Sequence, residues 1–396
     1  MSDESDESEE ATPKRETRAA LAAMLLAVAA VYHPLFLGRS LLSRDVGAWT
    51  VPARWLVRDA LSRGSLAQWC PWEGIGFPVA ADPLFASFYP VNLATLALPL
   101  AWGTSVYLFL HVAWGALGVF ALARRLKTSP AAAAVGGVAW ALSGVITSEW
   151  DGGVRLLPAA WFPWAAIAMG QVFVHASDAR RCARGALALG LVGAMMALTG
   201  EVFVALMGAF FALGGGLALA PHALPDRDAR RRIALALVAA GALALALSAP
   251  SWWPAVSLVA TTARAAAPGA GPRVEWVLHP MRLVDLALPR GIVDAQVAGL
   301  PAAVARFGAT PLYLSAYLGV TALALATAAV TRESQRWRPI ASVALAGLLL
   351  AVGDAAPFHR AFVFVVRPFS RMSSPEKFVL LTQASVAVLA AMGADR

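Results

Sequence analysis

The chain is poor in charged residues and in cysteine, and it lacks the common motifs of soluble enzymes. Only 14% of its 396 residues are charged, whereas soluble domains carry about 25%. Its two cysteines, Cys70 and Cys182, do not have the spacing of metal ligands. The P-loop, HExxH and GxSxG patterns are absent, so the sequence gives no support for a P-loop ATPase, a zincin or an α/β-hydrolase.

Hydrophobic residues are abundant instead, at 59% of the chain. Several apolar runs approach the ~20 residues that cross a hydrocarbon core as a helix. They are rich in Ala, Leu, Val and Gly and lack the alternating ~10-residue pattern of a membrane barrel. We therefore expect an all-α polytopic membrane protein.

The positive charge of the chain predicts its orientation. The net charge of +8 comes largely from short basic clusters between apolar runs, as the positive-inside rule requires, so it is no sign of nucleic-acid binding. Both termini are then cytoplasmic, and Cys70 and Cys182 lie on opposite sides of the membrane, where they cannot form a disulfide. About ten transmembrane helices are expected, at residues 19–37, 104–123, 130–147, 156–174, 185–200, 202–220, 233–258, 313–330, 340–352 and 378–392.

This topology divides the chain into a tail and one membrane domain. Residues 1–18 form an acidic, Ser-rich segment that we expect to be a disordered cytoplasmic tail. Residues 19–396 form a single transmembrane domain. It has two long extracytoplasmic segments, a first loop at 38–92 and a second segment at 259–311.

The first loop is rich in aromatic residues, as is typical of segments lying on a bilayer surface. Residues 49–64 have the pattern of a short amphipathic helix that lies at the membrane interface and ends at Gly64. Arg54 and Arg58, four residues apart, share one of its faces. Asp45 follows the first transmembrane helix by a few residues, which makes it the best single candidate for chemistry.

Other polar residues are predicted at the same outer face, where charged groups tend to mark function or internal pairing. They include Arg54, Arg58, Arg155, Glu201, Arg282, Arg371 and Lys377. Each has a simpler interpretation. Asp45 fits a solvated loop acid, Glu201 a turn residue and Asp82 a helix cap. Arg54 and Arg58 fit snorkelling interface residues, and Arg371 with Lys377 fits a site for lipid phosphate.

A series of short motifs runs through the first loop after Asp45. They are W-x-P at Trp69, G-x-P at Gly76, A-D-P at Ala81 and Y-P-x-N at Tyr89. Further on, the chain has PAAWFPW near Trp161, LTGE at Glu201, LHPMRLVDLALPRG near His279 and RPFSRMSSPEKFVLL near Arg371. Together these motifs resemble the YfhO-like family of bacterial membrane proteins. The chain departs from the family pattern at Cys70, where Asn is usual, and members of the family are commonly longer.

The resemblance implies a fold of the glycosyltransferase C superfamily and a place in the bacterial inner membrane. It also implies that a sugar moves from a polyprenyl-phosphate carrier to a glycan, lipid or protein acceptor with inversion. Asp45 would be the general base, its basicity raised by partial desolvation at the membrane edge. Arg54, Arg155, Arg282, Arg371 and Lys377 would stabilise the phosphate leaving group.

No cofactor is identified, and no residue pattern supports a divalent metal. The sequence leaves open two non-enzymatic alternatives, a lipid-carrier transporter or flippase and an inactive binding scaffold.

Overall fold

The computed structural model describes residues 3–72, 74, 76–220, 226–261, 276–289, 311–331 and 334–395; for residues 3–13, 260 and 261 it describes the backbone alone. The described residues form helices joined by turns and irregular segments. A pairing of Cys70 with Phe77 is an isolated bridge outside any strand. The predicted all-helical class is confirmed.

Seven helical segments among the described residues are long and apolar enough to cross a membrane. They are α5 (Leu100–Arg125), α6 with α7 (Pro130–Ala141 and Gly144–Gly152), α8 with α9 (Leu156–Ala159 and Phe162–Val174), α10 (Ala179–Leu198), α11 (Val202–Leu219), α12 (Arg227–Thr261), and η7 with α19 (Pro375–Phe378 and Val379–Ala394). Two shorter apolar helices are α16 (Val320–Val330) and α17 (Trp337–Ala351). Seven of the expected spans thus correspond to helices of sufficient length. The total of about ten transmembrane helices stays a prediction.

The amino-terminal helix is longer than its apolar run. Helix α1 (Asp3–Val31) begins in the acidic segment for which we expected disorder, and the short helix α2 (His33–Phe36) follows it. Acidic residues near a helix amino terminus interact favourably with the helix dipole, which is a physical reason for helix there.

The first loop contains the amphipathic helix that its sequence predicts. The π-helical turn η1 (Val46–Thr50) leads into α3 (Val51–Ser62), whose Ala53, Val57 and Ala60 are buried. The chain leaves α3 before Gly64, which has a φ of +69°. The 3-10 turns η2 (Val79–Ala81) and η3 (Pro83–Phe85) and the short helix α4 (Pro90–Thr95) complete the loop. Asp82 caps η3 by accepting from the Leu84 N–H at 2.9 Å, as expected.

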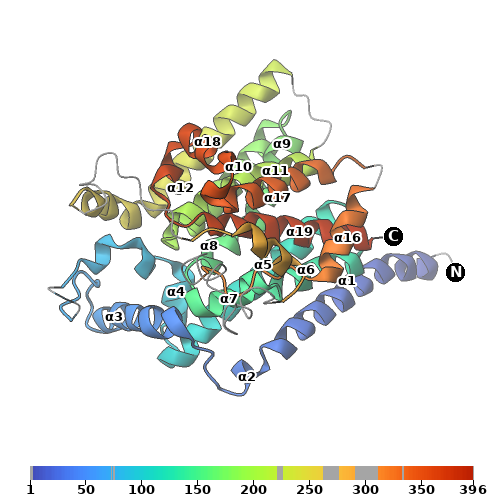
Figure 1. Cartoon of the computed structure of the whole chain (residues 1–396). Coiled ribbons are helices and arrows are strands. Elements are labelled where there is room, and N and C mark those ends of the chain that lie inside the picture. The colour runs from blue at the N-terminus through green and yellow to red at the C-terminus, as the bar shows by residue number, and fades with distance from the viewer. Residues whose placement is uncertain are drawn as a thin grey trace.

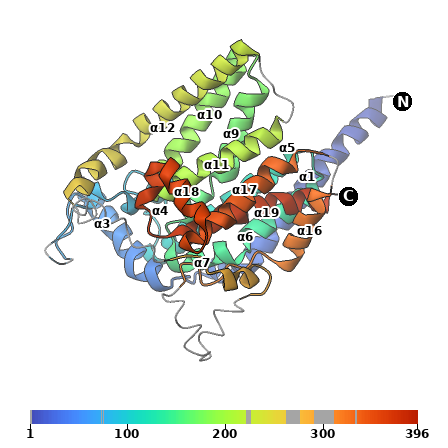
Figure 2. The ribbon, with the colours of Figure 1, turned by 45° about the horizontal axis from the view of Figure 1, so that its top comes forward.

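Helix α19 forms the centre of the bundle, and α12 lies at its edge. In the most apolar stretch of each, 89% of the residues are buried for α19 but 17% for α12. Helices α6, α16 and α17 pack around α19, and both views place α12 along one side of the molecule (Figures 1 and 2). Small residues allow this close packing: a Cβ at Gly136 would lie 2.8 Å from the carbonyl oxygen of Ala387.

Several helix boundaries differ from the expected ones. Helix α12 starts at Arg227, six residues before the expected start, and continues through Pro250 and Pro254. Helix α16 starts at Val320 instead of Tyr313. The reason is that the Leu318 N–H donates to the Leu286 carbonyl at 2.9 Å, outside any helix, and that Gly319 has a φ of +99°, which a right-handed helix does not allow.

The predicted outer segments contain the remaining short elements. They are η4 (Pro280–Leu286), η5 (Gly353–Ala355), α18 (Pro357–Val365) and η6 (Arg367–Arg371). Helix α18 lies in the segment between α17 and α19. The Gly/Pro/Ala-rich part of the second long segment, within residues 262–275, lies outside the described residues.

Candidate functional site

Asp45 lies between two anchored points of the first loop. Before it, the Leu41 N–H donates to Ser105 Oγ of α5 at 2.8 Å. After it, Val46 is completely buried, and a Cβ at Gly153 would lie 3.1 Å from Val46 Cγ2. The backbone of Asp45 is therefore fixed beside the turn that joins α7 to α8.

The Asp45 carboxylate is at the surface. Its side chain is 52% exposed and forms an ion pair at 3.4 Å with Arg44, which is 43% exposed. Exposed pairs of this kind contribute little to stability, so the carboxylate remains accessible to a ligand. The desolvation expected at the membrane edge is not provided by the protein itself, because the side chain is not buried.

Arg54 is buried instead of lying at the lipid or substrate surface. Its Nε donates to Thr104 Oγ1 at 3.1 Å, its Nη2 to Thr95 Oγ1 at 2.9 Å and its Nη1 to Asn92 Oδ1. Its guanidinium lies 4.5 Å from the Tyr107 ring centroid, and burial lowers the pKa of Arg54 to about 10. Arg54 thus fastens α3 to α4 and α5.

The Y-P-x-N motif provides part of the same buried polar layer. Asn92 accepts from Arg54 and donates through Nδ2 to the Ala86 carbonyl at 3.0 Å. The Tyr89 hydroxyl is 2.7 Å from His111 Nε2 and accepts from the Trp161 indole at 2.9 Å. The motif therefore joins the end of the first loop to α5 and to the turn between α8 and α9.

Arg58 and Arg371 are the exposed members of the predicted cationic set. Arg58 donates to the Leu98 carbonyl at 3.2 Å. Within the part of the chain that the structure describes, the Arg371 side chain has no hydrogen bond or ion pair. Arg371 is therefore a cation available to an anionic ligand.

Arg155 is held by Glu149, an acid that is not among the predicted site residues. Glu149, at the end of α7, is completely buried and accepts from Arg155 Nε at 2.7 Å and from its backbone N–H at 3.2 Å. The Arg155 guanidinium lies 5.5 Å from the Tyr313 ring centroid. An acid within an apolar helix, near an arginine after a Gly-Gly turn, was the sequence signal for this pair.

Arg282 occupies a second buried cluster. It donates to Glu376 Oε1 at 2.6 Å, to Asp285 Oδ2 at 3.0 Å and to the Tyr313 carbonyl at 2.9 Å. Glu376 also accepts from the Leu312 N–H at 2.9 Å. These contacts join η4, the segment before α16 and the start of the α19 span.

Glu201 and Lys377 form a third, nearly buried pair. Lys377 Nζ donates to Glu201 Oε1 at 3.0 Å and lies 5.7 Å from the Phe203 ring centroid. Gly200, which precedes Glu201, has a φ of +87°, and a Cβ there would overlap the Pro83 carbonyl oxygen. The first loop therefore packs directly on the turn between α10 and α11 that carries Glu201.

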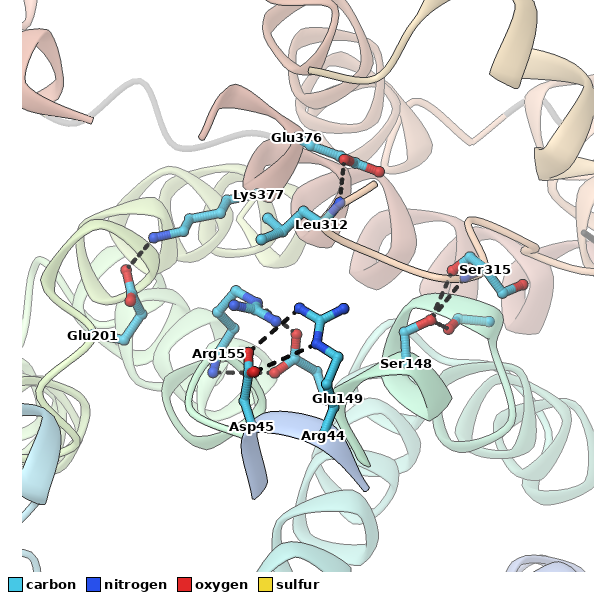
Figure 3. Close-up of polar contacts among 11 residues, drawn as sticks. Arg44, Asp45, Ser148, Glu149, Arg155, Glu201, Leu312, Ser315, Glu376 and Lys377 are labelled. Atoms are coloured by element: carbon cyan, nitrogen blue, oxygen red, sulfur yellow. Dashed lines mark hydrogen bonds and ion pairs between the residues drawn. The ribbon is translucent and has the colours of Figure 1, made fainter. Parts of the chain in front are cut away.

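These pairs lie at helix ends on one side of the bundle. Figure 3 shows Asp45 with Arg44, Glu149 with Arg155, and Glu201 with Lys377 at the ends of neighbouring helices. Glu201 is also close enough to influence Arg155 electrostatically. The arrangement is an exposed carboxylate at the edge of a set of fixed, mostly neutralised charges.

Metal and thiol chemistry would depend on the possible metal ligands and the two cysteines in the described part of the chain. No group of three or more His, Cys, Asp or Glu residues is arranged there to hold a metal ion. Cys70 and Cys182 are both buried and free. The candidate site consists of carboxylates, arginines and one lysine.

Comparisons with known proteins do not assign the chain to a family. No family model, no curated protein and no solved structure matches it. The resemblance to YfhO-like proteins stays a prediction from the motifs, and the site is interpreted from its own geometry.

Proposed function

We propose that this protein is a membrane glycosyltransferase that moves a sugar from a polyprenyl-phosphate carrier to a cell-envelope acceptor on the extracytoplasmic face. One observation carries the proposal. Asp45 presents an exposed carboxylate from a backbone that is fixed by Leu41 and Val46, at the same end of the bundle as the charged pairs around Arg155 and Lys377. A general base needs both this accessibility and this fixed position.

In the proposed reaction, Asp45 accepts the proton of an acceptor hydroxyl. The hydroxyl oxygen attacks the anomeric carbon of the donor from the face opposite the phosphate. As the new carbon–oxygen bond forms, the bond to the phosphate oxygen breaks, and the polyprenyl phosphate leaves with that electron pair. Attack from the opposite face inverts the anomeric configuration, and the protonated Asp45 returns its proton to water.

The leaving phosphate needs positive charge nearby. Arg371 is exposed, whereas Lys377, on the adjacent η7, is nearly buried and donates to Glu201, a bond that it would exchange for one to the phosphate. These two residues are the strongest candidates for contact with the phosphate. Arg155 and Arg282 lie in buried pairs with Glu149, Asp285 and Glu376, so we assign them to support of the site.

The test compares Asp45→Asn with Asp59→Asn in membranes supplied with labelled polyprenyl-phosphate sugar. Asp59 is the matched control, because it is an acid of the same loop that also pairs with an arginine, Arg63. We expect Asp45→Asn to reduce transfer about 10²- to 10⁴-fold at equal protein level, with Asp59→Asn near the unmodified rate.

Equal rates for the two variants would exclude Asp45 as the base. Movement of the lipid carrier across the membrane without sugar transfer would identify a transporter. Donor binding with neither transfer nor transport would identify a binding scaffold.

A further inference from the structure

A groove lies between α10 and α12, away from the candidate site. Its volume is about 420 Å³. Along α10 it is lined by Ala179, Cys182, Ala183, Ala186 and Leu187, and along α12 by Arg232, Leu235, Ala236, Ala239 and Leu243. Apart from Arg232, these side chains are apolar or, in Cys182, weakly polar, so the groove suits a hydrocarbon chain.

The two helices run side by side along the edge of the bundle (Figures 1 and 2). They touch closely at Gly190, where a Cβ would lie 2.8 Å from Leu243 Cδ2. Along α10 this contact lies beyond the lining residues, and its partner Leu243 lines the groove. The lining residues before it lie near the amino-terminal ends of α10 and α12, so the groove opens where both helices begin.

The mouth of the groove is strongly basic. Residues 176–184 and 226–232, which surround it, contain seven arginines and three aspartates. Arg232 is fixed at the mouth, because its Nη1 donates to the carbonyls of Ala176 and Ser177 at 3.2 and 3.1 Å. Arg231 is exposed and precedes Leu235 by one helical turn, on the same stripe of α12.

We propose that this groove binds an anionic phospholipid, with an acyl chain between Leu187 and Leu235 and the phosphate at Arg231 and Arg232. Charge complementarity favours this occupant over a zwitterionic lipid or a detergent, because basic pockets between membrane helices attract negatively charged headgroups. A role of the arginines in setting the membrane orientation explains the positive charge of these segments. It does not explain the groove beside them. The site is independent of the sugar-transfer reaction.

Native mass spectrometry of the full-length protein in detergent tests the proposal. The probes are phosphatidylglycerol and phosphatidylcholine with identical acyl chains. We expect a preference for phosphatidylglycerol that falls about fivefold for each arginine removed in Arg231→Gln and Arg232→Gln. The double variant Arg125→Gln/Lys127→Gln, which removes two charges from the ARRLK cluster after α5, should keep the preference.

A second variant changes the shape of the groove without changing its charge. Ala183→Trp fills it from the exposed side of α10 and should abolish tight phosphatidylglycerol binding while every arginine is kept. If Ala183→Trp keeps the full preference for phosphatidylglycerol, the groove is not the binding site, and the preference comes from diffuse attraction to the basic surface. Equal affinity for the two lipids in the unmodified protein, or equal losses in the ARRLK and groove variants, would overturn the specific site.

Discussion

Replacement of Glu149 by Gln should destabilise the protein strongly, although it changes only one atom type in the side chain. Glu149 is completely buried and accepts two hydrogen bonds from Arg155, whose side chain is 9% exposed. Gln keeps the size but removes the negative charge. Arg155 then stays buried as a cation, and Glu201, the other acid of the described residues that influences it, already pairs with Lys377.

The size of the effect follows from this burial. Removal of one partner from a buried ion pair costs about 3–5 kcal/mol, because the other charge stays desolvated and uncompensated. Replacement of both partners, in Glu149→Gln/Arg155→Met, removes that charge. The double variant should therefore be more stable than Glu149→Gln alone, with a coupling energy of about 2–3 kcal/mol.

Asp59 and Arg63 provide a matched comparison. Their carboxylate and guanidinium are 2.5 Å apart, but the Arg63 side chain is 65% exposed. An exposed pair contributes at most about 1 kcal/mol, so Asp59→Asn should have a small effect. The contrast separates burial from contact distance as the cause of the cost.

The assay is denaturant unfolding of the purified protein in detergent micelles, run in parallel for Glu149→Gln, Arg155→Met, the double variant and Asp59→Asn. The assigned role of burial is refuted if Glu149→Gln lowers the free energy of unfolding by no more than Asp59→Asn does. It is also refuted if the double variant loses the sum of the two single losses, since that would mean that Glu149 and Arg155 are uncoupled.

Three further predictions use the same unfolding measurement. Arg54→Lys keeps the charge but cannot donate in all three directions that Arg54 uses, so it should cost about 2 kcal/mol or more despite its conservative character. Burial raises the pKa of Asp82. The protonated side chain therefore favours folding at a pH below the ordinary pKa of Asp, and this contribution to stability is lost as the pH rises through the raised pKa. Asp82→Asn, which can still cap η3, should therefore be at least as stable as the unmodified protein at neutral pH, whereas Asp82→Ala should lose about 1 kcal/mol with the cap. Burial also lowers the pKa of His359. The neutral ring is thus favoured in the fold, and stability present above about pH 6.5 should fall as the pH drops; His359→Met should flatten this dependence, and an unchanged slope would contradict the assignment.

Helix positions were predictable where polar residues mark both ends of an apolar run. Residues 202–220 were expected to form a helix, and α11 spans Val202–Leu219, because Glu201 and the basic segment after α11 define its limits. The expected start at Tyr313 was wrong for the opposite reason. Nothing in the local sequence shows that the Leu318 N–H donates to the Leu286 carbonyl, which is distant along the chain.

The sequence places Asp45 just beyond the first apolar helix, but it does not give the contacts of the residues around it. The pattern of residues 49–64 placed Arg54 and Arg58 on one helix face, but α3 packs so that the first is buried and the second exposed. The difference depends on Asn92 and Thr104, about 40 to 50 residues further on. Periodicity gives the face of a helix, and only the tertiary fold supplies the partners.

The paired charges divide the predicted substrate-binding residues into two groups with opposite expected phenotypes. Arg282 is nearly enclosed by Glu376, Asp285 and the Tyr313 carbonyl, so Arg282→Gln should lower stability by several kcal/mol and activity only through the fold. Arg371 is exposed, so Arg371→Gln should leave unfolding unchanged within about 0.5 kcal/mol and should weaken use of the polyprenyl-phosphate donor. Unfolding and sugar transfer measured on both variants check this division. Loss of stability in Arg371→Gln, or normal stability in Arg282→Gln, would mean that burial does not separate the supporting charges from those that meet the substrate.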